Sequence, residues 1–223
     1  MINSLRLINF QDVVECQDLL HKSRESFLPI NYELNKGNVY GFISDFGCGS
    51  WGITTCLGGR TTQNYSGKIL LNNNEIQANQ LSNYSCFVTE KIFPNINSLD
   101  NMLTPETCIK KALAVSGQTF SVSQIKDIFC LSDGRFKRPL SEVSGEIWLI
   151  SLAVNFALGK DIFCYPWLNQ LDIERFKTAY EHNVIDFLKK ENKIIIVPSS
   201  QKKILRRYCD HMIIFDKEKL CYR

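Results

Sequence analysis

Three short, mainly apolar segments constrain the fold of this 223-residue chain more than any other feature. They are Val39–Ile43, Asp161–Cys164 and Lys193–Val197. Runs of this length without regular polar alternation are typical of strands that are buried on both faces. Helix-spaced apolar residues separate the last two segments, and a further helix (Gln201–Tyr208) and strand (Met212–Phe215) follow them. This alternation of strand and helix predicts an α/β fold with a mostly parallel sheet covered by helices.

The rest of the chain adds strands before this core and helices within it. Ile30, Tyr32 and Leu34 alternate with polar residues, which predicts a half-buried strand in an N-terminal antiparallel β portion. Helices are expected from Thr104 to a stop at Gly117, over Ser123–Leu131 and over Gly145–Leu158. One continuous helix is expected after an N-cap at Asp172, and its apolar face consists of Ile173, Phe176, Tyr180, Val184 and Phe187. We therefore expect one domain over residues 1–223, with the N-terminal β part at 1–94, an inserted helical lobe at 95–145 and the C-terminal core at 146–223.

Composition excludes several functional classes. Apolar residues make up 44% of the chain and charged residues 22%, as in globular proteins, and the net charge of +3 is too small to indicate a nucleic-acid partner. The nine cysteines are odd in number and lack C-x-x-C spacing, so we expect reduced thiols in a cytoplasmic protein and no metal site. No apolar run approaches the length of about 18 residues that spans a membrane.

A glycine-rich segment follows the first buried strand and precedes an expected helix. This is the context of a phosphate-binding loop, in which glycines let backbone N–H groups converge on an anion at a helix N-terminus. The pattern G-x-x-x-x-G-K-[ST] falls on residues 44–51, and only Gly49 matches it at a defining position. Gly47, Gly49, Ser50 and Trp51 are therefore candidate phosphate-loop residues in a degenerate form.

The order and spacing of segments resemble the ATP-binding subunits of ABC transporters over about residues 5–218. Leu28–Ile43 resembles the lead into that family's P-loop, and Phe93–Met102 resembles the stretch after its Q-loop. Leu140-Ser141, a long helix and Pro166 follow at the spacing from signature motif to Walker B. The C-terminal strand, helix and strand also match. The resemblance implies a P-loop NTPase-like ABC ATPase fold.

The residues at the family's reactive positions differ from the family pattern. Ser50 replaces the phosphate lysine and Trp51 the hydroxyl that holds Mg²⁺. Cys164 replaces the Mg²⁺-coordinating acid, and Tyr165 replaces the carboxylate that orients the attacking water. Phosphoryl transfer depends on positioning and on charge neutralisation, so these replacements predict a pseudo-ATPase that binds ATP and Mg²⁺ weakly at most.

The remaining family motifs are partly kept. The signature reads Leu140-Ser141-Glu142-Val143-Ser144, with the serine kept and both glycines lost. Ser200 stands at the switch histidine, and the Q-loop glutamine falls on Val88 or Thr89. Ser141 and Asp172 occupy positions that, in the family, face the nucleotide bound by a partner subunit. We therefore expect these two residues to contact a nucleotide in the partner's site.

The resemblance implies partners, because ABC ATPases act as pairs under a permease. The first hypothesis is an inactive subunit that pairs with an active ABC ATPase subunit, docks on an integral-membrane permease, and lies peripherally on the inner face of the membrane. Residues 88–117 would then receive a permease helix, with apolar side chains such as Ile92, Ile96 and Met102. The alternative is a stand-alone regulatory or interaction module on the same scaffold. A slow enzyme with Cys164 as nucleophile is disfavoured, because that thiol ends a buried strand.

Overall fold

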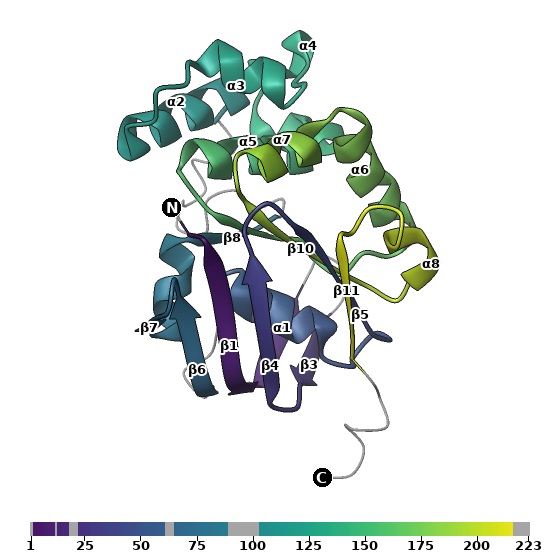
Figure 1. Cartoon of the computed structure of the whole chain (residues 1–223). Helices are drawn as coiled ribbons and strands as arrows, with labels where there is room; N and C mark the ends of the chain where they lie inside the picture. The colour runs from purple at the N-terminus through teal and green to yellow at the C-terminus, as the bar shows by residue number, and fades with distance from the viewer. Residues whose placement is uncertain (1, 12, 18–21, 61–64, 89–102, 216–223) are drawn as a thin grey trace. The chain divides into compact units, whose positions relative to one another are not determined.

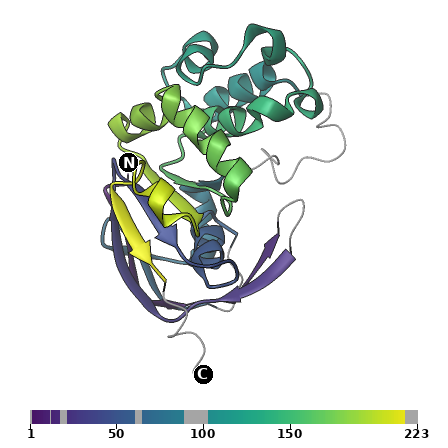
Figure 2. The same ribbon diagram turned by 90° about the vertical axis from the view of Figure 1, so that its right-hand side faces the viewer.

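The computed structural model describes residues 2–11, 13–17, 22–60, 65–88 and 103–215. These residues form two compact units (Figures 1 and 2). The first contains residues 1–87, 161–174 and 188–223, and the second contains residues 88–160 and 175–187. The second unit thus includes the predicted helical lobe together with the long apolar helix that follows it in sequence.

The first unit is built on three sheets. Its five-stranded sheet has the order β11-β5-β10-β9-β8, and every pairing within it is parallel. These strands are β5 (Val39–Ile43), β8 (Ser85–Phe87), β9 (Ile162–Cys164), β10 (Ile194–Ser199) and β11 (His211–Ile214). All residues of β5, β8, β9 and β10 are buried. The parallel α/β core predicted from the apolar segments is confirmed.

Antiparallel strands form the other two sheets of this unit. The four-stranded sheet has the order β4-β1-β6-β7, and the two-stranded sheet pairs β2 with β3. Figure 2 shows this β2–β3 hairpin as a purple ribbon. The strands are β1 (Ser4–Gln11), β2 (Val13–Gln17), β3 (Lys22–Ser26), β4 (Ile30–Asn35), β6 (Ser66–Leu71) and β7 (Asn74–Ile76). The predicted N-terminal antiparallel portion is therefore present.

Helix α1 (Ser50–Leu57) follows β5 and is buried along its whole length. Its sequence contains no charged residue, and it contacts β2, β3, β9 and β10. The unit also contains the 3-10 turn η1 (Ala78–Asn83), the short helix α8 (Lys202–Leu205), and the two ends of helices that extend into the second unit. Because α1 is covered on all sides, its N-terminus meets protein groups, and this determines the geometry of the candidate site.

The second unit is helical. It contains α2 (Pro105–Ser116), α3 (Val122–Ile128), α4 (Asp133–Phe136), the 3-10 turns η3 (Leu140–Glu142) and η4 (Ser144–Glu146), α5 (Ile147–Ala157), and parts of α6 (Gln170–Glu181) and α7 (Val184–Lys190). Thr104 caps α2 through a reciprocal capping box with Thr107, and Gly117 ends it in the left-handed conformation. Every residue of α5 is buried, as its uniformly apolar sequence predicts.

Two helix predictions near residue 172 need correction. Asp172 does not cap the helix but lies in the first turn of α6, where the Asn169 side chain accepts hydrogen bonds from the amides of Leu171 (2.8 Å) and Asp172 (3.0 Å). The predicted continuous helix also divides into α6 and α7, because Asn183 adopts a positive φ of 59° between them. The apolar spacing continues across this break, so periodicity alone did not reveal it.

No helix of the described residues is long and apolar enough to cross a membrane. Of the predicted permease-docking stretch at residues 88–117, residues 89–102 lie outside the described part of the chain, and Ile92, Ile96 and Met102 are among them. The prediction that this stretch receives a partner helix therefore stays a prediction.

A buried ion pair joins three segments of the first unit. Lys193 Nζ lies 2.8 Å from Asp161 Oδ1, and the amide of Ile2 donates to Asp161 Oδ2 at 3.1 Å. Both charged residues are buried. The carboxylate therefore connects the start of the chain with the segments leading into β9 and β10.

We predict that Asp161→Asn lowers the free energy of unfolding by about 3 kcal/mol, because it removes the carboxylate that neutralises a buried ammonium. Urea denaturation followed by circular dichroism measures the loss. Glu75→Gln is the matched control, since it removes the carboxylate of an exposed pair with Lys68 (2.8 Å) and should cost less than about 1 kcal/mol. Equal stability of the two variants would show that the buried pair contributes nothing beyond a surface pair.

Candidate functional site

The glycine-rich segment forms the turn between β5 and α1. Gly47 and Gly49 have φ values of 79° and 99°, in the left-handed region that glycine adopts without strain. Gly49 is the N-cap of α1 and has no capping side chain of its own. The first amides of a helix have no partner within the helix, so this turn needs an acceptor from elsewhere.

The carboxylate of Glu25, on β3, supplies that acceptor. Its Oε1 accepts from the Gly47 amide at 3.1 Å, and its Oε2 accepts from the amides of Gly49 at 3.1 Å and Gly52 at 2.8 Å. Glu25 is only 1% exposed. The turn thus holds an anion, and that anion belongs to the chain itself.

Two opposing effects act on the Glu25 carboxyl group. Burial raises its pKa above the ordinary value, and the amide donors of Gly52, Gly47, Gly49 and Trp51 act in the opposite direction. No ion pair to Glu25 occurs among the described residues. Backbone N–H groups and the N-terminus of α1 are therefore the groups that stabilise its charge. No local pattern in the sequence indicated this role for Glu25.

The structure brings Ser50 and Trp51 together with the glycines but turns them into the core. Ser50 is fully buried, and its Oγ lies 2.7 Å from the Oγ of Ser44 at the end of β5. Trp51 is 1% exposed and packs against the exposed Phe46, with ring centroids 5.4 Å apart. Its Nε1 is buried and has no hydrogen-bond partner among the described residues. Both side chains thus serve packing at this turn.

Cys164 and Tyr165 lie at the end of β9, in the interior of the parallel sheet. Both are fully buried. Cys164 pairs in register with Ile196 on β10 and with Phe87 on β8. Burial, with a smaller effect from Cys86, raises the pKa of the Cys164 thiol well above its ordinary value and also raises the pKa of the Tyr165 phenol. Both groups are therefore neutral at physiological pH, and neither is a base.

The other predicted positions are spread over both units. Ser200 is exposed just after β10, and Val88 is fully buried, whereas Thr89 lies outside the described residues. Ser141 is exposed in η3, in the second unit, and Asp172 is partly exposed on α6, in the first. Their predicted contact with a partner's nucleotide stays a prediction.

The predicted signature segment lies just before α5. Leu140–Glu142 forms a separate 3-10 turn, and Ser144–Glu146 is the segment that leads directly into α5. Val143-Ser144-Gly145, three residues after Leu140-Ser141, has the same apolar-Ser-Gly order as the motif.

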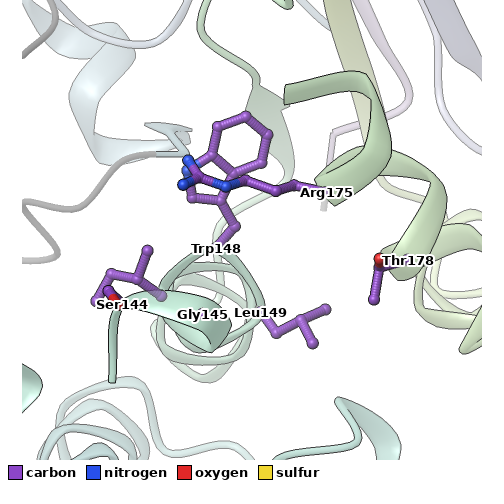
Figure 3. A pocket seen from close by; sticks show the side chains of 7 residues that line it. Ser144, Gly145, Trp148, Leu149, Arg175 and Thr178 are labelled. Carbon is purple, nitrogen blue, oxygen red and sulfur yellow. The ribbon is translucent and has the colours of Figure 1, made fainter. Parts of the chain in front are cut away.

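A small pocket lies beside this helix start, within the second unit. Its volume is about 50 Å³, and Ser144, Gly145, Trp148, Arg175 and Thr178 are among the residues that line it. Figure 3 shows the Arg175 guanidinium lying over the Trp148 ring, with the guanidinium carbon 5.5 Å from the ring centroid. Small-molecule sites are several-fold larger, at about 300 Å³ or more. The pocket therefore does not fit a substrate or nucleotide.

Comparison with known proteins supports the fold assignment. No family model and no curated protein matches the sequence. Solved structures do match. A Pyrococcus furiosus protein described as an ABC transporter ATP-binding protein is 19% identical to this chain, with a TM-score of 0.67. The match covers 95% of this chain and 97% of that one. A nucleotide-free ATP-binding cassette from an ABC transporter is 14% identical, with a TM-score of 0.67, over 96% of this chain and 88% of that one.

A dimeric bacterial ABC transporter cassette is also similar, at 12% identity and a TM-score of 0.65, over 95% of this chain and 94% of that one. The parallel sheet, the turn at the N-terminus of α1 and the antiparallel portion define an α/β fold of the P-loop NTPase type. Within that class, the chain has the fold of the ABC transporter ATP-binding cassette. At these identities the likeness concerns the fold.

We predict that Trp51 contributes to stability as a core residue. Trp51→Ala should lower the free energy of unfolding by about 3–5 kcal/mol, as for other large-to-small changes in a core. Trp51→Phe should cost under about 1.5 kcal/mol, because it keeps most of the ring and removes a buried N–H that has no partner in the described part of the chain. Urea denaturation measures both variants. A Trp51→Ala variant as stable as wild type would show that the side chain is not packed as described.

Proposed function

We propose that this chain is an ATP-binding cassette that does not hydrolyse ATP and acts as the non-catalytic partner of an active ATPase subunit on a membrane permease. The burial of Cys164 and Tyr165 carries the proposal. In the family that the sequence resembles, the corresponding positions are carboxylates that hold Mg²⁺ and orient the attacking water. Two neutral, buried groups with raised pKa values supply neither function.

The β5–α1 turn supports the same conclusion. Ser50 has no charge and lies against Ser44, and Trp51 has no hydroxyl and packs in the core. The carboxylate of Glu25 occupies the amide groups of the turn. A magnesium nucleotide therefore does not fit the residues present here, since it would meet a carboxylate and no lysine.

The cassette fold supports a role beside a second subunit. One similar solved structure is a dimeric ABC transporter cassette. A cassette without its own catalytic groups could still pair with a second cassette and dock on a permease, and we propose that this chain does so. We propose that the partner carries the intact ATPase site, that Ser141 or the neighbouring Ser144 faces its nucleotide, and that the complex lies on the cytoplasmic face of a membrane.

The first test concerns hydrolysis. We predict that the purified protein shows no Mg²⁺-dependent ATPase activity above a heat-inactivated sample, in an assay of phosphate release. Ser50→Lys together with Trp51→Ser should not create activity, because the positions of Cys164 and Tyr165 still lack a carboxylate. Turnover by that double variant would mean that the catalytic acids lie elsewhere in the chain.

The second test concerns partners. We predict that the full-length protein, tagged and cross-linked in its own cells, is recovered from the membrane fraction with a cassette that has intact ATPase motifs and with an integral-membrane protein. The tag alone and a permease-deleted strain are the controls. Recovery outside the membrane fraction without either partner would favour the stand-alone regulatory module.

A further inference from the structure

The hairpin strand β3 places a negative charge where a P-loop places its ligand. We propose that Glu25 is the resident anion of the β5–α1 turn, an internal ligand that occupies the amide nest and closes it to phosphate. The inference uses contacts within the first unit only and does not depend on a partner subunit. It goes beyond the absence of hydrolysis, because it states what fills the site.

The hydrogen bonds have the pattern expected for a bound oxyanion. Both carboxylate oxygens accept from backbone amides, at 2.8–3.1 Å, and the donors come from the loop and from the first turn of α1. Converging amides at a helix N-terminus are the usual donors to phosphate oxygens. Glu25 therefore uses the same donors that a phosphate would need.

The glycines of this segment fit the approach of β3. A Cβ atom at Gly52 would lie 3.0 Å from the Cβ of Glu25, and one at Gly49 would lie 3.0 Å from the Cβ of Phe27. Gly52 is not part of the P-loop pattern, so its presence has no explanation in phosphate binding. It is explained if the backbone of α1 must come close to the Glu25 side chain.

The hairpin also holds Glu25 firmly in place. Glu25 pairs in register with Val14 on β2, and Val14 is buried. Two residues further on, Phe27 is buried against Phe10, with ring centroids 5.8 Å apart. A ligand attached to the same chain has a high effective concentration, and a second anion beside the carboxylate would be repelled. Free phosphate therefore competes poorly for the nest.

The test uses inorganic phosphate as the probe and follows the backbone amides of Gly47, Gly49 and Gly52 by ¹⁵N NMR. We expect no saturable shift of these amides in the wild type and a saturable shift in Glu25→Ala, whose nest is empty. Glu33→Ala is the matched control, because it removes an exposed carboxylate from β4 and should behave as the wild type. A wild-type response equal to that of Glu25→Ala would overturn the proposal.

A second variant tests the role of Glu25 if Glu25→Ala does not fold. Glu25→Gln has nearly the same size but is neutral, and its NH₂ group replaces one of the two acceptor oxygens. We expect hydrogen exchange to rise by about tenfold or more, relative to Glu33→Ala, at the amides that lose their acceptor, which are either Gly47 or Gly49 and Gly52. Unchanged exchange would overturn the proposal.

These outcomes are distinguishable from failure of the proposed function. A phosphate response in the wild type without ATP hydrolysis would overturn the role of Glu25 alone. Hydrolysis without any response of the glycine amides would overturn the proposed function alone.

Discussion

The turn between β5 and α1 contains backbone N–H groups that need hydrogen-bond acceptors, and the surrounding structure has to supply these acceptors. Several backbone N–H groups converge there, and all of α1 is buried, so water does not satisfy them. In a P-loop, the phosphate oxygens of a nucleotide accept these hydrogen bonds. Here the carboxylate of Glu25 does so, and the packing of β3 against α1 follows from it. The hairpin, the glycine spacing and the charge-free sequence of α1 therefore all serve the contact between Glu25 and the amides of the turn.

Packing also dominates at two positions that the sequence analysis aligned with reactive residues of the family it resembles. Trp51 and Tyr165 are both at most 1% exposed. In the predicted alignment, each occupies a position where the family that the sequence resembles carries a small or charged group that must reach a ligand. Large buried rings stabilise a fold by several kcal/mol each, roughly, and this benefit is available only when no metal or phosphate needs the space. At these two positions the side chains thus contribute to the stability of the core.

Much of the fold could be predicted because its signals are local. The apolar run of β5 and the cap at Thr104 with the stop at Gly117 are read from neighbouring residues, and the structure has them at the predicted bounds. The N-cap of α6 was missed because Asn169 and Asp172 are equally good caps, and their choice depends on where the preceding chain arrives. The break at Asn183 was hidden because the apolar spacing is the same on both sides.

The residues of the candidate site could be predicted only in part, because some of them lie far apart in the sequence. Motif spacing located the turn, since its glycines lie within one short segment. The identity of the group that fills the turn depends on a contact between residues 22 or more positions apart, from Glu25 to Gly47. Nothing in the local sequence of β3 distinguishes a carboxylate that points inward from one that points to solvent. The carboxylate that accepts the hydrogen bonds of the turn therefore becomes visible only when the strand, the turn and the helix are assembled.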